Sequence, residues 1–183
     1  MKDSQDDILA FWFEETSPPQ WFQPDDAFDA AIRARFMDVY ERAARGELDG
    51  WRDTARGCLA LCILLDQFPR NMFRGTPRAF ATDGKALGIA RIAVESGFDQ
   101  QLPVPQRFFI YLPFEHSETI DDQHESVALF EAIKEAEPVG YDYAVRHRDV
   151  IAQYGRFPHR NKILGRDNTP EEEAYLAQPG AGF

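Results

Sequence analysis

Two short stretches of this chain carry the same polar pattern directly after an apolar run. The first is FPRN at residues 68–71 and the second is FPHRN at residues 157–161, and we call them the FPRN turn and the FPHRN turn. Arginine offers a planar fork of N–H donors that fits a carboxylate or a phosphate, and asparagine adds a donor and an acceptor. If the two turns converge on one pocket, we expect the ligand to be an anionic small molecule or a peptide carboxylate.

The candidate ligand-binding residues are the polar side chains in and beside these turns. They are Gln67, Arg70, Asn71, Arg74, Arg156, His159, Arg160 and Asn161. A structural alternative stays open, in which Phe fills the core, Pro stops the preceding helix, and Arg with Asn binds the carbonyls that a helix end leaves unsatisfied. If the turns are purely structural, the alternative function is that of a protein–protein interaction module.

A third polar turn, FEHSE at residues 114–118, suggests acid–base chemistry. Imidazole titrates near neutral pH and a carboxylate fixes its tautomer, so His116 is a candidate general base. In this alternative the chain is a hydrolase-like enzyme in which Asp66, His116 or Glu118 moves protons and the arginines stabilise an anion. The spacing of His116, Glu118 and His124 matches no strong metal motif, and we expect no metal.

Composition excludes several classes of protein. Acidic residues outnumber basic ones 31 to 20 and the formal net charge is -11, which argues against nucleic-acid binding. The longest apolar run, residues 58–65, is far below the roughly 20 residues that span a bilayer. We see no basic leader at the N-terminus and therefore expect a cytoplasmic protein with no membrane partner.

Cofactor motifs are missing from the sequence. Without GxGxxG, GxxxxGK[ST], GxSxG or CxxC there is no local support for a nucleotide cradle, a nucleophile elbow or a zinc ribbon, and we expect no cofactor. The two cysteines, Cys58 and Cys62, lie in the apolar run, and we interpret them as core thiols rather than a redox pair. The oligomeric state stays open.

The hydrophobic period is helical along the whole chain, which predicts an all-α fold of seven or eight helices in a single domain, residues 1–183. Proline at 69 is expected to end one helix, because it disfavours helix in the residue before it. We expect residues 108–112 to be helical rather than a strand, because no partner strand is evident. The expected helices cover residues 27–48, 52–66, 76–97, 119–137, 141–154 and 169–176.

Two consecutive segments of the chain carry opposite charge. Eight acids and one lysine lie between residues 115 and 137, whereas six basic and two acidic residues lie between 141 and 166. Consecutive helices usually neighbour one another, so these segments are expected to neutralise each other. That interpretation accounts for much of the basic charge near the FPHRN turn without a ligand.

Several long motifs together resemble a known family. LALCILLDQFPRNMFRGTPRAFATD, FIYLPFEHSE and YGRFPHRNKILGRDNTPEEEAYL, in this order, are similar to the signatures of the bacterial domain-of-unknown-function family DUF924. The resemblance implies antiparallel helix pairs in a right-handed superhelical array like that of tetratricopeptide repeats (TPR-like). It carries over no activity, but it marks Asp66, Gln67, Arg70, Asn71, Arg74, His116, Ser117, Glu118, Arg156, His159, Arg160, Asn161 and Arg166 as motif positions.

Overall fold

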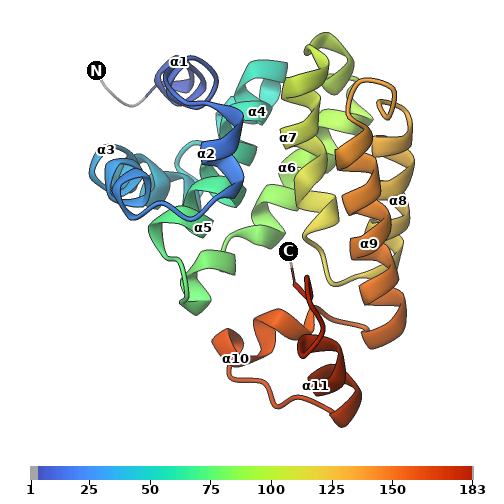
Figure 1. Cartoon of the computed structure of the whole chain (residues 1–183). Coiled ribbons are helices and arrows are strands. Elements are labelled where there is room, and N and C mark those ends of the chain that lie inside the picture. The colour runs from blue at the N-terminus through green and yellow to red at the C-terminus, as the bar shows by residue number, and fades with distance from the viewer. Residues whose placement is uncertain (1–3, 183) are drawn as a thin grey trace. The chain divides into compact units, whose positions relative to one another are not determined.

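The computed structural model describes residues 4–182, which divide into two compact units. Unit 1 comprises residues 4–74 and 78–113, and unit 2 comprises residues 75–77 and 114–182. Over residues 4–182 every regular element is helical, which confirms the all-α prediction (Figure 1). The single domain and the TPR-like array stay predictions.

The chain up to Glu115 alternates α-helices with short 3₁₀- or π-helical segments, which are labelled η. In order they are α1 (Gln5–Ala10), η1 (Phe11–Glu15), α2 (Pro18–Phe22), α3 (Asp26–Ala44), η2 (Asp49–Asp53), α4 (Ala55–Cys62), η3 (Ile63–Gln67), α5 (Phe68–Met72), η4 (Pro77–Phe80), α6 (Asp83–Glu95), η5 (Asp99–Gln101) and α7 (Val104–Glu115). Within unit 1, α3 contacts α5 and α4 contacts α6. Residues 108–112 lie inside α7, as expected.

The core of unit 1 is aromatic. Trp12, Phe36 and Phe68 are fully buried, with the Phe36 and Phe68 ring centroids 4.8 Å apart and those of Trp12 and Phe68 5.7 Å apart. Such rings bury large apolar areas, and their contacts add to that stabilisation. Phe68 of the FPRN turn therefore fills the core, and its burial fixes the position of Arg70, two residues later in the chain.

Proline at position 69 does not end the helix, contrary to the sequence prediction. Between α4 and α5 the chain forms the π-helix η3, and the N–H of Phe68 donates to the carbonyl of Ile63, five residues earlier. Pro69 then occupies the first turn of α5, where its missing N–H costs nothing. Because π-helical segments recur at functional sites, the position of Asp66 and Gln67 in η3 agrees with their choice as candidate residues.

A second correction concerns the start of α6. The sequence places the helix start at residue 76, but residues 77–80 form the 3₁₀ turn η4 and α6 begins at Asp83. Its end agrees with expectation, because Gly97 adopts the left-handed conformation with φ 66°. The buried thiols of Cys58 and Cys62 confirm the interpretation as core residues.

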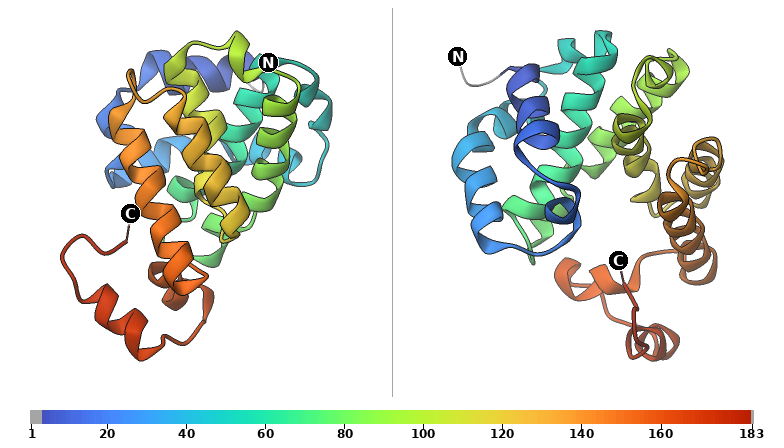
Figure 2. Two further views of the ribbon diagram at one scale, coloured as in Figure 1. Left: turned by 90° about the vertical axis from the view of Figure 1, so that its right-hand side faces the viewer. Right: turned by 45° about the horizontal axis from the view of Figure 1, so that its top comes forward.

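Unit 2 is built on a pair of neighbouring helices followed by short elements. Its helical elements after α7 are α8 (Ile120–Glu131), α9 (Pro138–Tyr154), η6 (Pro158–Arg160), α10 (Asn161–Leu164) and α11 (Pro170–Leu176). Figure 2 shows α8 and α9 side by side, and the two helices are in extensive contact. Gly155, with φ 69°, ends α9 as predicted. A capping box at Thr169 starts α11, which agrees with the expected helix over residues 169–176.

Candidate functional site

The FPRN turn lies in unit 1 within a network of ion pairs. The Arg70 guanidinium donates to Asp83 through Nη1 at 2.9 Å and Nη2 at 3.0 Å, and its Nη1 also lies 3.1 Å from Asp66 Oδ1. Burial alone would lower the pKa of Arg70, but the carboxylates of Asp66 and Asp83 raise it. The fork of Arg70 is therefore directed at carboxylates of its own unit.

The other candidates of this turn also face carboxylates. Gln67 Nε2 donates to Asp66 at 2.5 Å and Asn71 Nδ2 donates to Asp29 at 2.8 Å. Arg74 donates to Asp29 through two bonds of 2.7 and 2.9 Å. Burial would raise the pKa of Asp29, but the bonds from Arg74 and Asn71 hold it below the usual value. Arg70, Asn71 and Arg74 thus bind the segment around the FPRN turn to carboxylates of α3 and α6 in unit 1.

Sequence reasoning missed the partners of these donors. Asp29 lies in the first turn of α3 and Asp83 is the first residue of α6, so each is an ordinary acidic residue at a helix start. The one sequence feature that points to Asp29 and Asp83 is their place near a helix N-terminus, where an acid can also bind an arginine from a neighbouring turn. Without the fold, no spacing links them to the FPRN turn.

In unit 2, Arg156 and Asn161 share one glutamate. Arg156 donates to the two oxygens of Glu172 at 2.6 and 2.8 Å, and Asn161 Nδ2 donates to Glu172 at 3.2 Å and to Asn168 at 2.9 Å. The bond from Arg156 is the largest cause that lowers the pKa of Glu172 to about 2. These contacts attach α11 to the FPHRN turn.

Glu118, a candidate proton donor in the enzyme alternative, is an ion-pair partner. Arg166 donates to its two oxygens at 2.7 and 2.9 Å, and the backbone N–H of Phe157 donates to it at 2.8 Å. Burial would raise the pKa of Glu118, but these bonds lower it below its usual value. The ionised carboxylate of Glu118 thus fixes the FPHRN turn through these bonds. Acid–base catalysis by Asp66, His116 or Glu118 stays a prediction.

Three of the four histidines gather around Phe157 in unit 2, and we call His116, His147 and His159 the histidine cluster. Ring centroids are 6.4 Å apart for His116 and His147, 5.5 Å for His147 and Phe157, and 5.6 Å for Phe157 and His159. The Arg160 guanidinium lies 4.5 Å from the Phe157 ring and donates to the His116 carbonyl at 3.1 Å. The fold thus joins the FEHSE and FPHRN turns.

Charges of both signs act on the histidine cluster, since the Arg160 guanidinium and the carboxylates of Glu115 and Glu118 lie near its rings. Burial, with a smaller contribution from the charge of Arg160, lowers the pKa of His159 to about 4, although Glu118 opposes the shift. Burial likewise lowers the pKa of His147 to about 2, with Arg160 contributing in the same direction, although the bond to the Tyr143 carbonyl opposes it. A carbonyl oxygen only accepts, so His147 Nδ1, 2.8 Å away, carries the proton. Both rings are therefore neutral at pH 7.

Over residues 4–182, no group of three or more His, Cys, Asp or Glu side chains is placed to hold a metal ion. His124 is exposed on α8, and Ser117 donates to Asp122 at 2.6 Å. Among the helices of the same residues, none is both long and apolar enough to cross a bilayer.

The fold is that of an all-helical protein with arginine-centred turns. Comparison with known proteins identifies its family. The chain belongs to the bacterial family of proteins of unknown function DUF924, which matches residues 8–180. It is 44% identical to the protein of unknown function ATU0120 from Agrobacterium tumefaciens, whose solved structure superposes with a TM-score of 0.91 over 96% of this chain and 97% of that one. No curated protein matches the chain. These similarities confirm the family resemblance.

Proposed function

We propose that the chain binds a small anion, a carboxylate or a phosphate, through Arg160, with His116 and His159 beside it. Arg160 is buried in unit 2, where its guanidinium lies over the Phe157 ring and donates to the His116 carbonyl, and its charge acts on His147 and His159. A buried guanidinium offers charge-assisted hydrogen bonds that are about twice as strong as neutral ones. The neutral imidazole of His159 adds an N–H donor without a further charge to desolvate.

The observation that carries the proposal is the contrast between the two turns. In the FPRN turn, carboxylates surround Arg70 and raise its pKa, so the local potential is negative. In the histidine cluster, the charge of Arg160 lowers the pKa of both His147 and His159, although the carboxylate of Glu118 opposes the shift at His159 and that of Glu115 lies 3.3 Å from His147 Nδ1. A positive charge in a partly buried site attracts an anion. This favours the FPHRN turn as the ligand-binding one.

The wider version of the site comes from the sequence. In it both turns form one pocket, and further contacts come from Gln67, Arg70, Asn71, Arg74, Arg156 and Asn161. It stays a prediction, since each of these side chains already binds an acidic or amide partner within its own unit.

Thermal unfolding in the presence of anions tests the proposal. A ligand that binds only the folded chain must raise its melting temperature as ligand concentration rises. We expect inorganic phosphate, acetate or a tripeptide with a free carboxylate to raise the melting temperature at pH 7, and Arg160→Gln to abolish the shift. His159→Gln is expected to weaken the shift without abolishing it.

Arg156→Gln is the matched control. It removes the arginine directly before the FPHRN turn, whose fork is bound to Glu172. We expect this variant to melt at a lower temperature and yet keep the anion-induced shift. If no anion raises the melting temperature of the wild type, or if Arg160→Gln and Arg156→Gln respond alike, the proposal is wrong.

A further inference from the structure

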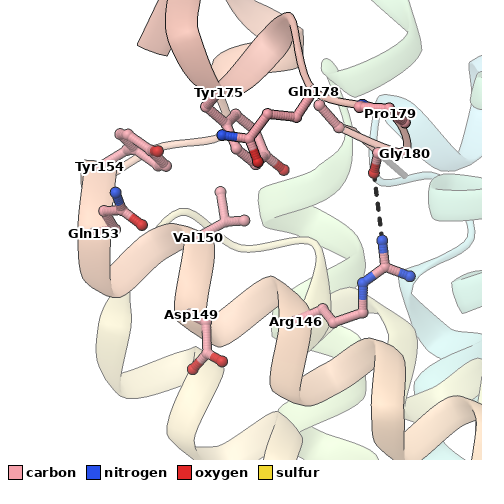
Figure 3. A pocket seen from close by; sticks show the side chains of 10 residues that line it. Arg146, Asp149, Val150, Gln153, Tyr154, Tyr175, Gln178, Pro179 and Gly180 are labelled. Atoms are coloured by element: carbon pink, nitrogen blue, oxygen red, sulfur yellow. Dashed lines mark hydrogen bonds between the residues drawn. The ribbon is translucent and has the colours of Figure 1, made fainter. Parts of the chain in front are cut away.

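Unit 2 contains a pocket that shares no residue with the histidine cluster (Figure 3). It lies between the C-terminal half of α9, the end of α11 and residues 178–181, and its volume is about 340 Å³. Ligand pockets range over roughly 300–1,000 Å³, so this one suits a molecule with a single ring. The side chains that line the pocket decide which kind of ring fits it.

Two tyrosines give the pocket an aromatic lining. Tyr154 of α9 and Tyr175 of α11 have ring centroids 5.2 Å apart. Both rings pack against the cluster of Val150, Ile151 and Phe157, and Val150 itself lines the pocket. Such a lining favours a planar ring, because a flat group packs against aromatic rings and loses contact with water when it covers them.

Two amide side chains add hydrogen-bonding groups to the lining. Gln153 lies near the end of α9 and Gln178 follows α11, so the two amides come from different elements, as Figure 3 shows. Both residues are exposed, and their amides can therefore exchange bonds to water for bonds to a ligand. An amide carries an acceptor oxygen beside its N–H donors, which matches a ring edge with a carbonyl next to an N–H. A lactam or a cyclic imide has such an edge.

The charged residues of the lining favour a neutral ligand, because both already have partners in unit 2. Arg146 donates to the Gly180 carbonyl at 3.4 Å and stacks on Tyr143, with 4.8 Å from the guanidinium carbon to the ring centroid. Asp149 accepts from Arg148 at 2.6 and 3.0 Å. A charged ligand would lose hydration and meet one lining residue of like charge, whereas a neutral ligand leaves all of these contacts in place.

We propose that this pocket binds a neutral planar heterocycle of one ring with lactam or imide edges, the class to which uracil belongs. The ring lies against Val150 and the two tyrosines, and its carbonyl and N–H groups bond to the amides of Gln153 and Gln178. The proposal does not depend on anion binding at Arg160, because the lining of the pocket includes neither Arg160 nor the histidines.

Isothermal titration with uracil tests the proposal, with orotate and a uracil methylated on both ring nitrogens as matched probes. The methylated ring lacks the N–H donors and orotate adds a carboxylate, so we expect each to bind about tenfold more weakly than uracil. Gln153→Leu and Gln178→Leu each remove one amide and should weaken uracil binding by about tenfold. Because both residues are exposed, the variants should keep the helical circular-dichroism spectrum of the wild type.

Gln101→Leu is the matched control, since Gln101 is an exposed glutamine of unit 1 that does not line the pocket. We expect it to leave uracil affinity unchanged. Arg146→Met should leave it unchanged as well, because the ligand carries no charge. Absence of uracil binding, or equal affinity in the wild type, Gln153→Leu and Gln178→Leu, overturns the proposal.

Two further outcomes would also overturn it. Orotate that binds more tightly than uracil, with this preference lost in Arg146→Met, would show that the pocket selects a charge. Loss of uracil binding in Arg160→Gln but not in Gln178→Leu would place the ring at the histidine cluster instead.

Discussion

The carboxylate of Asp29 on α3 is held by Arg74, 45 residues later in the chain, through two hydrogen bonds of 2.7 and 2.9 Å. Asn71 adds a third bond to the same carboxylate at 2.8 Å. A nearly buried carboxylate with three donors stays ionised and fixes the segment after α5 against α3. The FPRN turn is therefore part of the framework of unit 1.

Loss of Arg74 should destabilise the fold. Arg74→Ala leaves the buried Asp29 carboxylate with Asn71 as its remaining donor from this turn, and we expect the free energy of unfolding to fall by about 1–3 kcal/mol. Urea unfolding followed by circular dichroism measures it. Arg148→Ala, which breaks an exposed pair on α9, should change it by about 0.5 kcal/mol or less. Equal effects of the two substitutions would contradict this account.

Two glycines in helices should respond to alanine in opposite directions. A Cβ at Gly57 in α4 would lie 1.8 Å from the backbone oxygen of Trp51, so Gly57→Ala should cost about 3 kcal/mol or more. A Cβ at Gly88, exposed within α6, meets nothing within 4 Å, so Gly88→Ala should stabilise by about 0.5–1 kcal/mol. Melting temperatures of the two variants check both signs. A stable Gly57→Ala protein would mean that η2 and α4 do not approach so closely.

Acid should weaken the attachment of α11. Because the bonds from Arg156, Thr169 and Asn161 lower the pKa of Glu172 from 4.5 to about 2, the carboxylate contributes stability above pH 4.5 and loses it as pH falls toward 2. Glu172→Gln should therefore be less stable than the wild type at pH 7, with the difference shrinking below pH 4.5. Urea midpoints at several pH values measure it. A difference that stays constant with pH would show that the charge of Glu172 contributes nothing.

His159 should stay neutral down to about pH 4. Arg160, Arg166 and His116 oppose its protonation and Glu118 favours it, and burial adds the largest effect. The folded pKa of about 4 lies below the ordinary 6.5, so the unfolded chain binds the proton first and stability falls as pH drops from 6.5 toward 4. NMR titration of the ring protons checks this. His159→Gln should flatten that part of the stability curve, and a His159 that titrates near 6.5 would contradict the burial.

Much of the fold follows from local patterns in the sequence. Apolar spacing predicts α3 and α9, the Thr169 motif predicts the start of α11, and Gly155 predicts the end of α9. These features depend on residues within one or two turns of each other. The uninterrupted passage from α4 into α5 was not predictable in the same way, because a proline permits either a helix end or a first turn, and η3 decides between them.

The candidate site was predictable in its residue types but not in its partners. The sequence identifies Arg70, Arg160 and His116, and only the fold shows that Asp83 binds the first and that the other two meet beside Phe157. His147 was not among the candidates, because it lies in the middle of α9 without a motif. The partners lie 13 residues apart for Arg70 and Asp83 and 44 apart for His116 and Arg160, and such pairing depends on tertiary packing, which spacing in the chain does not reveal.

The π-helix η3 sets the rotational phase of everything that follows it in unit 1. An α-helix turns by about 100° per residue, so removing one residue from η3 and closing it into α-helix would rotate α5 by about that angle. Arg70 and Asn71 would then leave Asp83 and Asp29, and Phe68 would leave the aromatic core. The wide turn between Ile63 and Phe68 therefore makes the chain length of this segment as strict a requirement as its composition.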